Sequence, residues 1–190
     1  KTLSKIDRPA ITTTFPTKRP NKHIRILDLG ANVDSTPEHL CQFAIMGTIL
    51  SQAVNNIEAP RIALLNIGKE EIKGNELVKK TAELLSQHKS INYVGYIEAN
   101  HLFDDIADVV VCDGFVGNVM LKTIEGAVRF MGNLAKQEFL KNIGTKLLML
   151  PVKPLMSRII KRMDVDSHNG AALLGLNGIV IKSHGGTTVR

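Results

Sequence analysis

The chain has 190 residues and a formal net charge of +6, and 44% of its residues are apolar although only 4% are aromatic. At this length one domain can bury about 70% of its unfolded surface, so it needs no disulfide or metal cross-links to fold. No apolar run approaches the roughly 18 residues that a membrane-spanning helix requires. These features exclude a disulfide-rich mini-protein and a membrane-spanning chain, and they predict one domain with an aliphatic core.

The first unit predicted in chain order is a strand followed by a long helix. The apolar run within residues 24–34 leads, through Ser35 and Glu38 at capping-box spacing, into a helix from Pro37 to Val54. This helix is apolar nearly all round, which indicates burial either within the domain or at a subunit interface. Gly47 would let another helix approach closely.

The same alternation of apolar run, turn and helical period recurs along the chain. Strands are predicted within 61–68, 91–97, 107–114 and 178–186, and helices within 76–87 and 115–131. Strands that alternate with helices are typical of βαβ units. We therefore predict an α/β domain with a mainly parallel sheet.

Residues 144–163 form a predicted basic amphipathic segment. From Arg129 to Arg162 the chain carries eight lysines and arginines against one acid, a local charge of +7. The segment breaks at Pro151 and Pro154 and then continues as a helix with apolar residues on one face and basic residues on the other, namely Leu155, Met156, Ile159, Ile160 and Met163 against Arg158, Lys161 and Arg162. The periodicity fits a helix at an anionic membrane surface or an ordinary surface helix that meets the core.

A binding site is expected beyond the carboxyl ends of the strands, where open α/β sheets hold their ligands. Polar residues and glycines that follow the predicted strands gather there: Asp28, Asn32, Asn66, Gly68, Lys73, Asn75, Asp113, Asn118, Lys182 and His184. Two junctions, Gly74-Asn75 and Gly117-Asn118, open helices whose free amides favour an anion. The same dipeptides also serve as ordinary caps.

Two basic side chains at this edge have open roles. Lys73 lies just before a helix and could neutralise a phosphate, polarise a carbonyl oxygen or be a solvated loop lysine. His184 could be an acid, a base or a surface residue, because its ordinary pKa is near neutral.

Other chemistries find little support in the sequence. Cys112 ends an apolar run, and both it and Cys41 are predicted to be core thiols in a reducing compartment. Metal-ligand spacing, a P-loop and a G-x-G-x-x-G fingerprint are absent from the sequence. The basic stretch lacks the interleaved aromatics of a nucleic-acid site. We expect no metal, no cofactor and no nucleic acid.

Four motifs resemble the bacterial PlsX family of phosphate acyltransferases. They are "LDLGANVDSTPEHLCQFAIMGTI", "ALLNIGKEEIKGNELVKKTAELL", "ADVVVCDGFVGNVMLKTIEGA" and "ALLGLNGIVIKSHG", which follow the family's order over nearly the whole chain. The resemblance implies a three-layer, Rossmann-like α/β fold related to phosphate acetyltransferases and to isocitrate and isopropylmalate dehydrogenases.

The resemblance also implies an activity and a set of partners. Such enzymes transfer a fatty acyl group from acyl carrier protein to inorganic phosphate, giving acyl phosphate and free carrier protein, an early step of phospholipid synthesis. It implies a cytoplasmic homodimer on an anionic membrane surface, whose product goes to a membrane glycerol-3-phosphate acyltransferase. It also favours the membrane interpretation of 144–163.

Under this resemblance we assign roles to the candidate residues. The predicted catalytic residues are Lys73, Asn118, Asp113 and His184. The predicted substrate-binding residues are Gly68, Gly74, Asn75, Gly117, Asn32 and Lys182. The predicted membrane-contact residues are Leu155, Arg158, Ile159, Lys161 and Arg162.

The chain departs from the family in two respects. Family members are longer, so we expect 1–190 to be a single acyltransferase domain that lacks N-terminal elements and a closing C-terminal helix. Asn169 stands where the family usually has glycine. Two alternative functions stay open: a short-chain phosphate acetyl- or butyryltransferase that uses coenzyme A, and a non-catalytic module that docks carrier protein.

Overall fold

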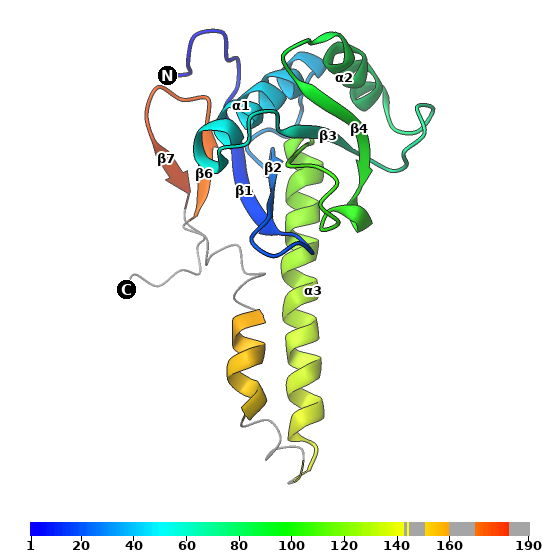
Figure 1. Ribbon diagram of the computed structural model, residues 1–190, viewed down its shortest axis with the longest axis vertical. Helices are drawn as coiled ribbons and strands as arrows, with labels where there is room; N and C mark the ends of the chain where they lie inside the picture. The colour runs from blue at the N-terminus through cyan, green and yellow to red at the C-terminus, as the bar shows by residue number, and fades with distance from the viewer. Residues whose placement is uncertain (143, 145–150, 160–169, 183–190) are drawn as a thin grey trace.

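The computed structural model describes residues 1–142, 144, 151–159 and 170–182. In chain order the elements are β1 (Ala10–Pro16), β2 (His23–Leu27), α1 (Pro37–Asn55), β3 (Arg61–Asn66), α2 (Glu76–Gln87), β4 (Asn92–Glu98), the 3-10 turn η1 (Ala99–His101), β5 (Val109–Val111), α3 (Gly114–Leu140), β6 (Ala171–Leu174) and β7 (Val180–Lys182). Figure 1 shows their arrangement around one twisted sheet.

The strands form a seven-stranded sheet in the order β4-β3-β5-β2-β1-β6-β7. β2, β3, β4, β5 and β6 run in one direction, whereas β1 and β7 run in the other. The prediction of an α/β fold with a mainly parallel sheet is confirmed. β1 and β6 were not among the predicted strands, although the β-branched run of β1 is typical of one.

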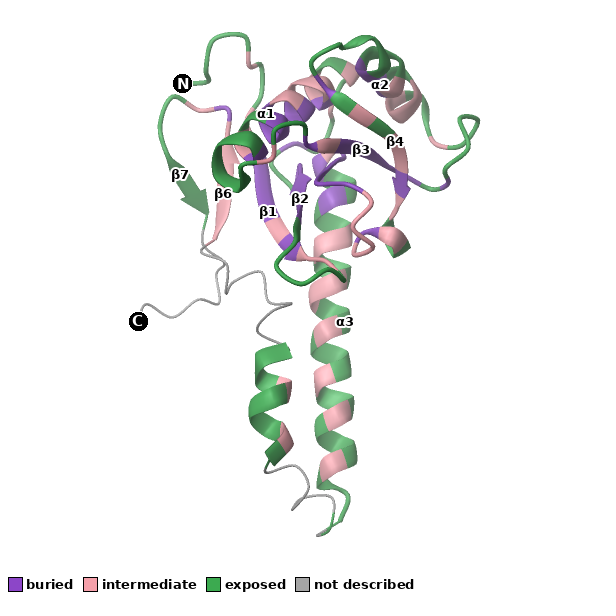
Figure 2. Ribbon diagram, in the orientation of Figure 1, coloured by how far each residue is buried: buried purple, intermediate pink, exposed green. Residues whose placement is uncertain are grey.

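Helices cover both faces of the sheet and make three layers. On one face, α1 and α2 pack on apolar side chains such as Leu27, Leu64 and Val109. On the other face, the first turns of α3 pack with Met120 and Ile124 on a second apolar cluster. Figure 2 shows that burial concentrates in the strands and in the side of α1 that faces them. The central strands are buried on both faces, as parallel strands are.

The start of α1 differs from the prediction by one residue. Thr36, not Ser35, is the N-cap: the His39 amide donates to Thr36 Oγ1 at 3.3 Å, and the Thr36 amide donates to His39 Nδ1 at 3.0 Å. Histidine can take the place of Glu38 in this reciprocal pair because its imidazole nitrogen accepts a hydrogen bond as a carboxylate does.

Gly47 of α1 permits close packing, but against the sheet and not against a helix. A Cβ at this position would lie 2.7 Å from Val109 Cγ1 and 3.1 Å from Leu27 Cδ1. The face of α1 around Gly47 is therefore buried within the domain. Ile49 and Val54 on the helix are exposed, with 59% and 61% of their surface accessible, so the interface alternative for that side stays a prediction.

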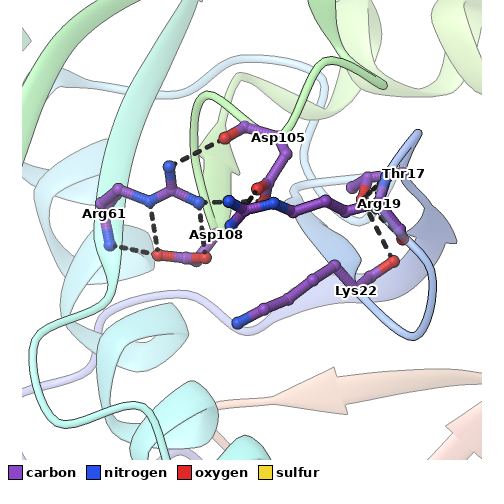
Figure 3. A network of polar contacts seen from close by, with 6 residues as sticks. All are labelled: Thr17, Arg19, Lys22, Arg61, Asp105 and Asp108. Atoms are coloured by element: carbon purple, nitrogen blue, oxygen red, sulfur yellow. Dashed lines mark hydrogen bonds and ion pairs between the residues drawn. The ribbon is translucent and has the colours of Figure 1, made fainter.

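The end of the sheet opposite the strand carboxyl ends is tied by an ion-pair network (Figure 3). Arg61 at the start of β3 donates from Nε and Nη2 to Asp108, each at 3.0 Å, and from Nη2 to Asp105 Oδ1, also at 3.0 Å. Arg19 of the β1–β2 turn reaches Asp105 Oδ2 at 3.1 Å. The network joins β3, the β4–β5 connection and the β1–β2 turn.

α3 is much longer than the sheet is tall and projects beyond it (Figure 1). Residues 151–159 are also helical, so Pro151 and Pro154 lie within a helix where the sequence predicted a break.

Candidate functional site

The parallel strands bring three chain junctions to one edge of the sheet. β3 ends at Asn66, β4 at Glu98 and β5 at Val111, and each is followed by the start of a helix or turn. Because β3 lies between β4 and β5, these junctions are neighbours in space. The edge predicted to hold the ligand is the place where the described residues form a large cavity.

This cavity has a volume of about 720 Å3 and is mostly apolar. Its walls come from α1 and α2, the strand ends, the η1 region and the first three turns of α3: Leu40, Leu64, Leu65, Asn66, Ile67, Gly74, Asn75, Val78, Ala99, Asn100, Phe103, Val111, Cys112, Asp113, Phe115, Val116, Val119, Met120, Thr123 and Ile124. A volume of roughly 300–1,000 Å3 with a few polar groups is typical of a small-molecule site. The site therefore combines an apolar interior with polar groups at the strand ends.

The β3–α2 loop folds over Asn66. Asn66 Nδ2 donates to the Lys73 carbonyl at 3.3 Å, and its Oδ1 accepts from the Ile67 amide at 2.9 Å. Gly74 has a φ of +92°, and a Cβ there would collide with Asn66 Oδ1. Asn75 then caps α2 by accepting from the Val78 amide at 3.0 Å. Gly74 and Asn75, two of the predicted substrate-binding residues, thus line the cavity. The loop requires glycine at position 74 because of the positive φ and the close Asn66 side chain.

Lys73 and Gly68 lie beside the cavity and not in its lining. A Cβ at Gly68 would be 2.9 Å from Lys73 Cγ and 2.7 Å from Glu70 Oε2. The stem of Lys73 therefore covers buried Gly68, while the Lys73 side chain is exposed. Gly68 therefore packs under side chains of its own loop, and its predicted role as a backbone contact stays a prediction.

The start of α3 already carries its own anion. Asp113 Oδ1 accepts from the amides of Phe115 at 3.0 Å and Val116 at 3.1 Å, and the Gly117 amide donates to the Asp113 carbonyl at 2.9 Å. A phosphate at this helix start would meet a carboxylate. The start of α2 has a neutral cap, Asn75, and its first turn carries the carboxylate of Glu76.

Gly117 was predicted to let a ligand approach the backbone, and this is wrong. A Cβ at Gly117 would collide with the Asp28 carbonyl oxygen and would lie 3.0 Å from Cys112 Sγ. The space beside this glycine is filled by the β2–α1 loop, because α3 packs directly on that loop. Gly117 is a packing position.

Asn32 lies in a buried hydrogen-bond network around Asp28. Asp28 Oδ2 accepts from Asn32 N at 2.7 Å and Asn32 Nδ2 at 2.8 Å, and Asn32 Nδ2 also donates to the Pro9 carbonyl at 2.8 Å. Asp28 Oδ1 accepts from the amides of Ile11 at 2.8 Å and Ala31 at 3.0 Å. Asn32 therefore shapes the β2–α1 loop rather than facing a substrate, which corrects its predicted role.

Asn118 and Lys182 do not line the cavity. Asn118 is exposed and outside the cavity lining; its Cβ lies 3.2 Å from the position that a Gly30 Cβ would take. Lys182 pairs with Ala171 at the end of antiparallel β7, so it lies at the opposite edge of the sheet, and its predicted placement is wrong. His184 lies outside the described residues.

In the basic segment, Leu155, Arg158 and Ile159 are exposed. Lys161 and Arg162 lie outside the described residues. Within the part that the structure describes, no helix is both long and apolar enough to cross a membrane, and no cluster of three or more His, Cys, Asp or Glu residues could hold a metal ion.

Cys112 is a buried free thiol at the cavity floor. Burial raises its pKa strongly, and the neighbouring charges of Asp113 and Asp28 raise it further. Its Sγ donates to the Asp28 carbonyl at 3.5 Å. The thiol stays protonated and is a poor nucleophile, as expected from its position in an apolar run.

The apolar cavity wall on α3 was not recognised in the sequence. It consists of side chains spaced one, three and four residues apart along the helix: Phe115, Val116, Val119, Met120, Thr123 and Ile124. The same spacing is typical of any helix that packs on a core. Only the position of α3 at the strand ends distinguishes this face as a cavity wall.

The chain resembles known proteins over its full length. A family model described as "Fatty acid synthesis protein" matches residues 1–190. The phosphate acyltransferase of Coxiella burnetii is 58% identical over 190 residues, which are 100% of this chain and 55% of that protein. That of Alcanivorax borkumensis is 55% identical over 188 residues, 99% of this chain and 55% of that protein. The chain thus spans about half the length of the curated relatives it matches.

Solved structures share the fold. A phosphotransacetylase from Streptococcus pyogenes superposes with a TM-score of 0.53 at 18% identity, covering 67% of this chain and 44% of that one. EutD phosphotransacetylase from Staphylococcus aureus has a TM-score of 0.50 at 13% identity with the same coverage. At these identities the likeness concerns the fold alone, and it confirms the predicted similarity of fold to phosphate acetyltransferases.

Proposed function

The chain belongs to the fatty acid synthesis protein family as a homologue of phosphate acyltransferases, and from that premise we propose that it transfers a fatty acyl group from acyl carrier protein to inorganic phosphate. The products are acyl phosphate and free acyl carrier protein, an early step on the way to phosphatidic acid. Because the chain covers 55% of its relatives' length, the proposal concerns the full-length protein.

One observation carries this proposal: the cavity at the strand ends is apolar inside and polar where β3 and β5 end. Asn66 and Asn75 stand at the β3–α2 junction and Asp113 at the β5–α3 junction. An acyl thioester has the same division, a hydrocarbon chain with one polar carbonyl group. The cavity therefore suits an acyl donor better than a compact polar substrate.

The proposed chemistry is direct attack of phosphate on the thioester. A phosphate oxygen forms a bond to the carbonyl carbon, the carbon–sulfur bond breaks, and the carrier's thiol leaves and takes up a proton. A well-placed donor to the oxyanion that develops is worth about 3–4 kcal/mol. No acyl-enzyme is required, in keeping with the protonated state of Cys112.

The residues proposed to act are ranked by their surroundings. Lys73, an exposed cation beside the cavity, and Asn75, which lines the cavity and caps α2 with a neutral side chain, are the first candidates for holding phosphate or the oxyanion. Asp113 caps α3 and would position that helix start rather than bind phosphate. Asn118 and His184 stay proposals of lower rank.

The proposed partners follow from the family and from charge. Acyl carrier protein is acidic, and it and anionic lipid are two partners that the stretch from Arg129 to Arg162, with its local charge of +7, would attract. We propose a cytoplasmic homodimer at the membrane surface that passes acyl phosphate to a membrane glycerol-3-phosphate acyltransferase.

The test is an acyl phosphate assay on the full-length protein with Lys73→Ala and Asn75→Ala. Loss of one good donor is expected to lower kcat about 100-fold or more. Lys69→Ala is the matched control, since this exposed lysine lies in the same loop outside the cavity lining. Wild-type rates in both site variants would overturn the residue assignment.

A second arm compares donors. Palmitoyl-acyl carrier protein should be used far better than acetyl- or butyryl-coenzyme A. The reverse preference would replace the proposal by a short-chain coenzyme A enzyme, and no transfer from any donor, with carrier protein still bound, would leave a docking module.

A further inference from the structure

The cavity is elongated along α3. Asp113 caps this helix at the strand ends, and the cavity wall continues along the helix to Thr123 and Ile124. Eleven residues separate Asp113 from Ile124, which is about 16 Å of helix at 1.5 Å per residue. The cavity therefore has a polar end at the strand edge and a distal end three turns along α3.

The distal part offers a ligand almost no polar contact. Thr123 is the one residue with a polar side chain among those that α3 contributes beyond its N-cap, and its hydroxyl already donates to the Val119 carbonyl at 2.8 Å. Phe103 also lines the cavity, and its ring packs edge-on against Phe15 with centroids 6.4 Å apart. Such a wall offers a charged or sugar-like group few hydrogen-bond partners and therefore favours an apolar ligand.

We propose that this distal part holds the alkyl chain of the acyl donor and that Thr123 and Ile124 set the chain length accepted. The proposal rests on the proposed function and deepens it. The reacting carbonyl lies at the Asn75 and Asp113 end, and the chain runs along α3. Carbon–carbon bonds of about 1.5 Å advance an extended chain by about 1.25 Å per carbon, so the wall accommodates roughly a dozen carbons in extended form.

The position of Thr123 makes it the side chain to change. It is exposed in the chain although it lines the cavity, so a larger side chain there fills the cavity without entering the core. Ile124 is half-buried and packs beside it on the α3 face of the core. Thr123→Phe should shorten the cavity along α3, and Ile124→Ala should lengthen it. The two substitutions should therefore change the accepted chain length in opposite directions.

The experiment uses the full-length protein and two readouts. The first is binding of cis-parinaric acid, a fluorescent linear fatty acid, and the second is acyl phosphate formation from octanoyl-, dodecanoyl- and hexadecanoyl-acyl carrier protein. Each buried methylene is worth about 0.8 kcal/mol, or about fourfold in binding. Thr123→Phe should therefore weaken the probe and the hexadecanoyl donor by about tenfold or more, with little change for the octanoyl donor. Ile124→Ala should shift the preference toward the longest donor.

Ala127→Phe is the matched control, because it adds the same ring at an exposed α3 position outside the cavity lining. It should leave both readouts unchanged. An unchanged probe affinity and an unchanged donor profile in folded Thr123→Phe would overturn the inference, as would an equal loss over all three donors, which is the result expected if another part of the protein fills the cavity. The remaining outcome concerns the proposed function alone. If the wild-type protein shows no transferase activity, but Thr123→Phe still weakens probe binding, the proposed function is overturned and the inference about the cavity stands.

Discussion

Arg61 and Asp108 show how one ion pair fixes the end of the sheet away from the site. Asp108 is 7% exposed and accepts three hydrogen bonds from Arg61, from the backbone amide at 2.8 Å and from Nε and Nη2 at 3.0 Å each. Burial alone would raise the Asp108 pKa, but the hydrogen bonds and positive charge of Arg61 outweigh burial and lower it. The folded state therefore holds Asp108 ionised where the unfolded chain begins to take up a proton.

The stability that this pair contributes should depend on pH. Because the folded pKa of Asp108 is lowered, the contribution is present above the unfolded value of about 3.9 and is lost as the pH falls through the folded value. Arg61→Met should cost about 2 kcal/mol of unfolding free energy at neutral pH, a modest figure for a buried pair because Arg61 is partly exposed. The loss of unfolding free energy caused by Arg61→Met should be smaller in acid than at neutral pH. Urea denaturation of wild type and variant at neutral pH and at a pH below the unfolded Asp pKa measures this difference.

Lys141→Met is the control for this experiment. Lys141 pairs with Glu138, but both side chains are about two-thirds exposed, so its loss should change stability little at either pH. An Arg61→Met cost that is the same at neutral and acid pH would contradict the role assigned to Asp108.

At the scale of elements, the junction of α3 with the β2–α1 loop determines the geometry of the site. Gly114 and Gly117 both face this loop without room for a side chain; a Cβ at Gly114 would lie 2.6 Å from Asp28 Oδ2. Asp28 in turn accepts three hydrogen bonds from Ala31 and Asn32 of the loop and one from the Ile11 amide of β1. The helix that supplies the cavity wall is therefore seated on a buried polar network.

Gly117→Ala should disrupt the packing of α3 on the β2–α1 loop. The added methyl group would overlap a backbone carbonyl that cannot move without breaking the Asp28 network, so a loss of about 3 kcal/mol or more is expected in urea or thermal denaturation. Gly126→Ala in the same helix is the control, because nothing lies within 4 Å of its Cβ position. It should stabilise α3 by about 0.5–1 kcal/mol. Equal tolerance of the two substitutions would show that α3 is not held at Gly117.

At the scale of the whole molecule, several large apolar side chains of the projecting part are exposed. Phe130 and Met131 of α3 are 61% and 63% exposed, and Leu155 and Ile159 of the 151–159 helix are each 50% exposed. The stretch from Arg129 to Arg162 has a local charge of +7, whereas the rest of the chain sums to −1. Apolar surface combined with positive charge is the composition expected for a contact with anionic lipid or with a second copy of the protein.

Flotation with vesicles of phosphatidylglycerol and phosphatidylethanolamine tests the proposed membrane contact. Ile159→Glu should reduce the vesicle-bound fraction, since a carboxylate is repelled by the anionic surface and resists burial in the acyl region. Ile179→Glu makes the same change at a position that is 94% exposed in the β6–β7 turn, and it should leave binding unchanged. Equal binding of wild type and Ile159→Glu would remove Ile159 from the membrane contact.

Much of the fold could be predicted because it depends on local pattern. Alternating apolar runs and helical periods are properties of short segments, so the βαβ units, the helices from Pro37 and from the residue after Asn75, and the buried state of Cys112 could be read from the residues. β1 and β6 were missed because their pairing depends on partners far along the chain, such as Ala10 opposite Leu174.

The roles of the glycines and asparagines were decided only by tertiary structure. A glycine in a sequence indicates that another group approaches the backbone closely, but it does not identify that group. The Asp28 carbonyl approaches Gly117, and the Asn66 side chain approaches Gly74. Asn32 and Lys182 followed predicted strands equally well, yet one is buried in a hydrogen-bond network and the other lies at the far edge of the sheet. The sequence by itself determined the α/β units, the family and the basic stretch, because these features depend on residues that are contiguous in the chain. The cavity and its α3 wall exist only once the ends of β3, β4 and β5 meet, because a cavity is formed by residues distant in the chain.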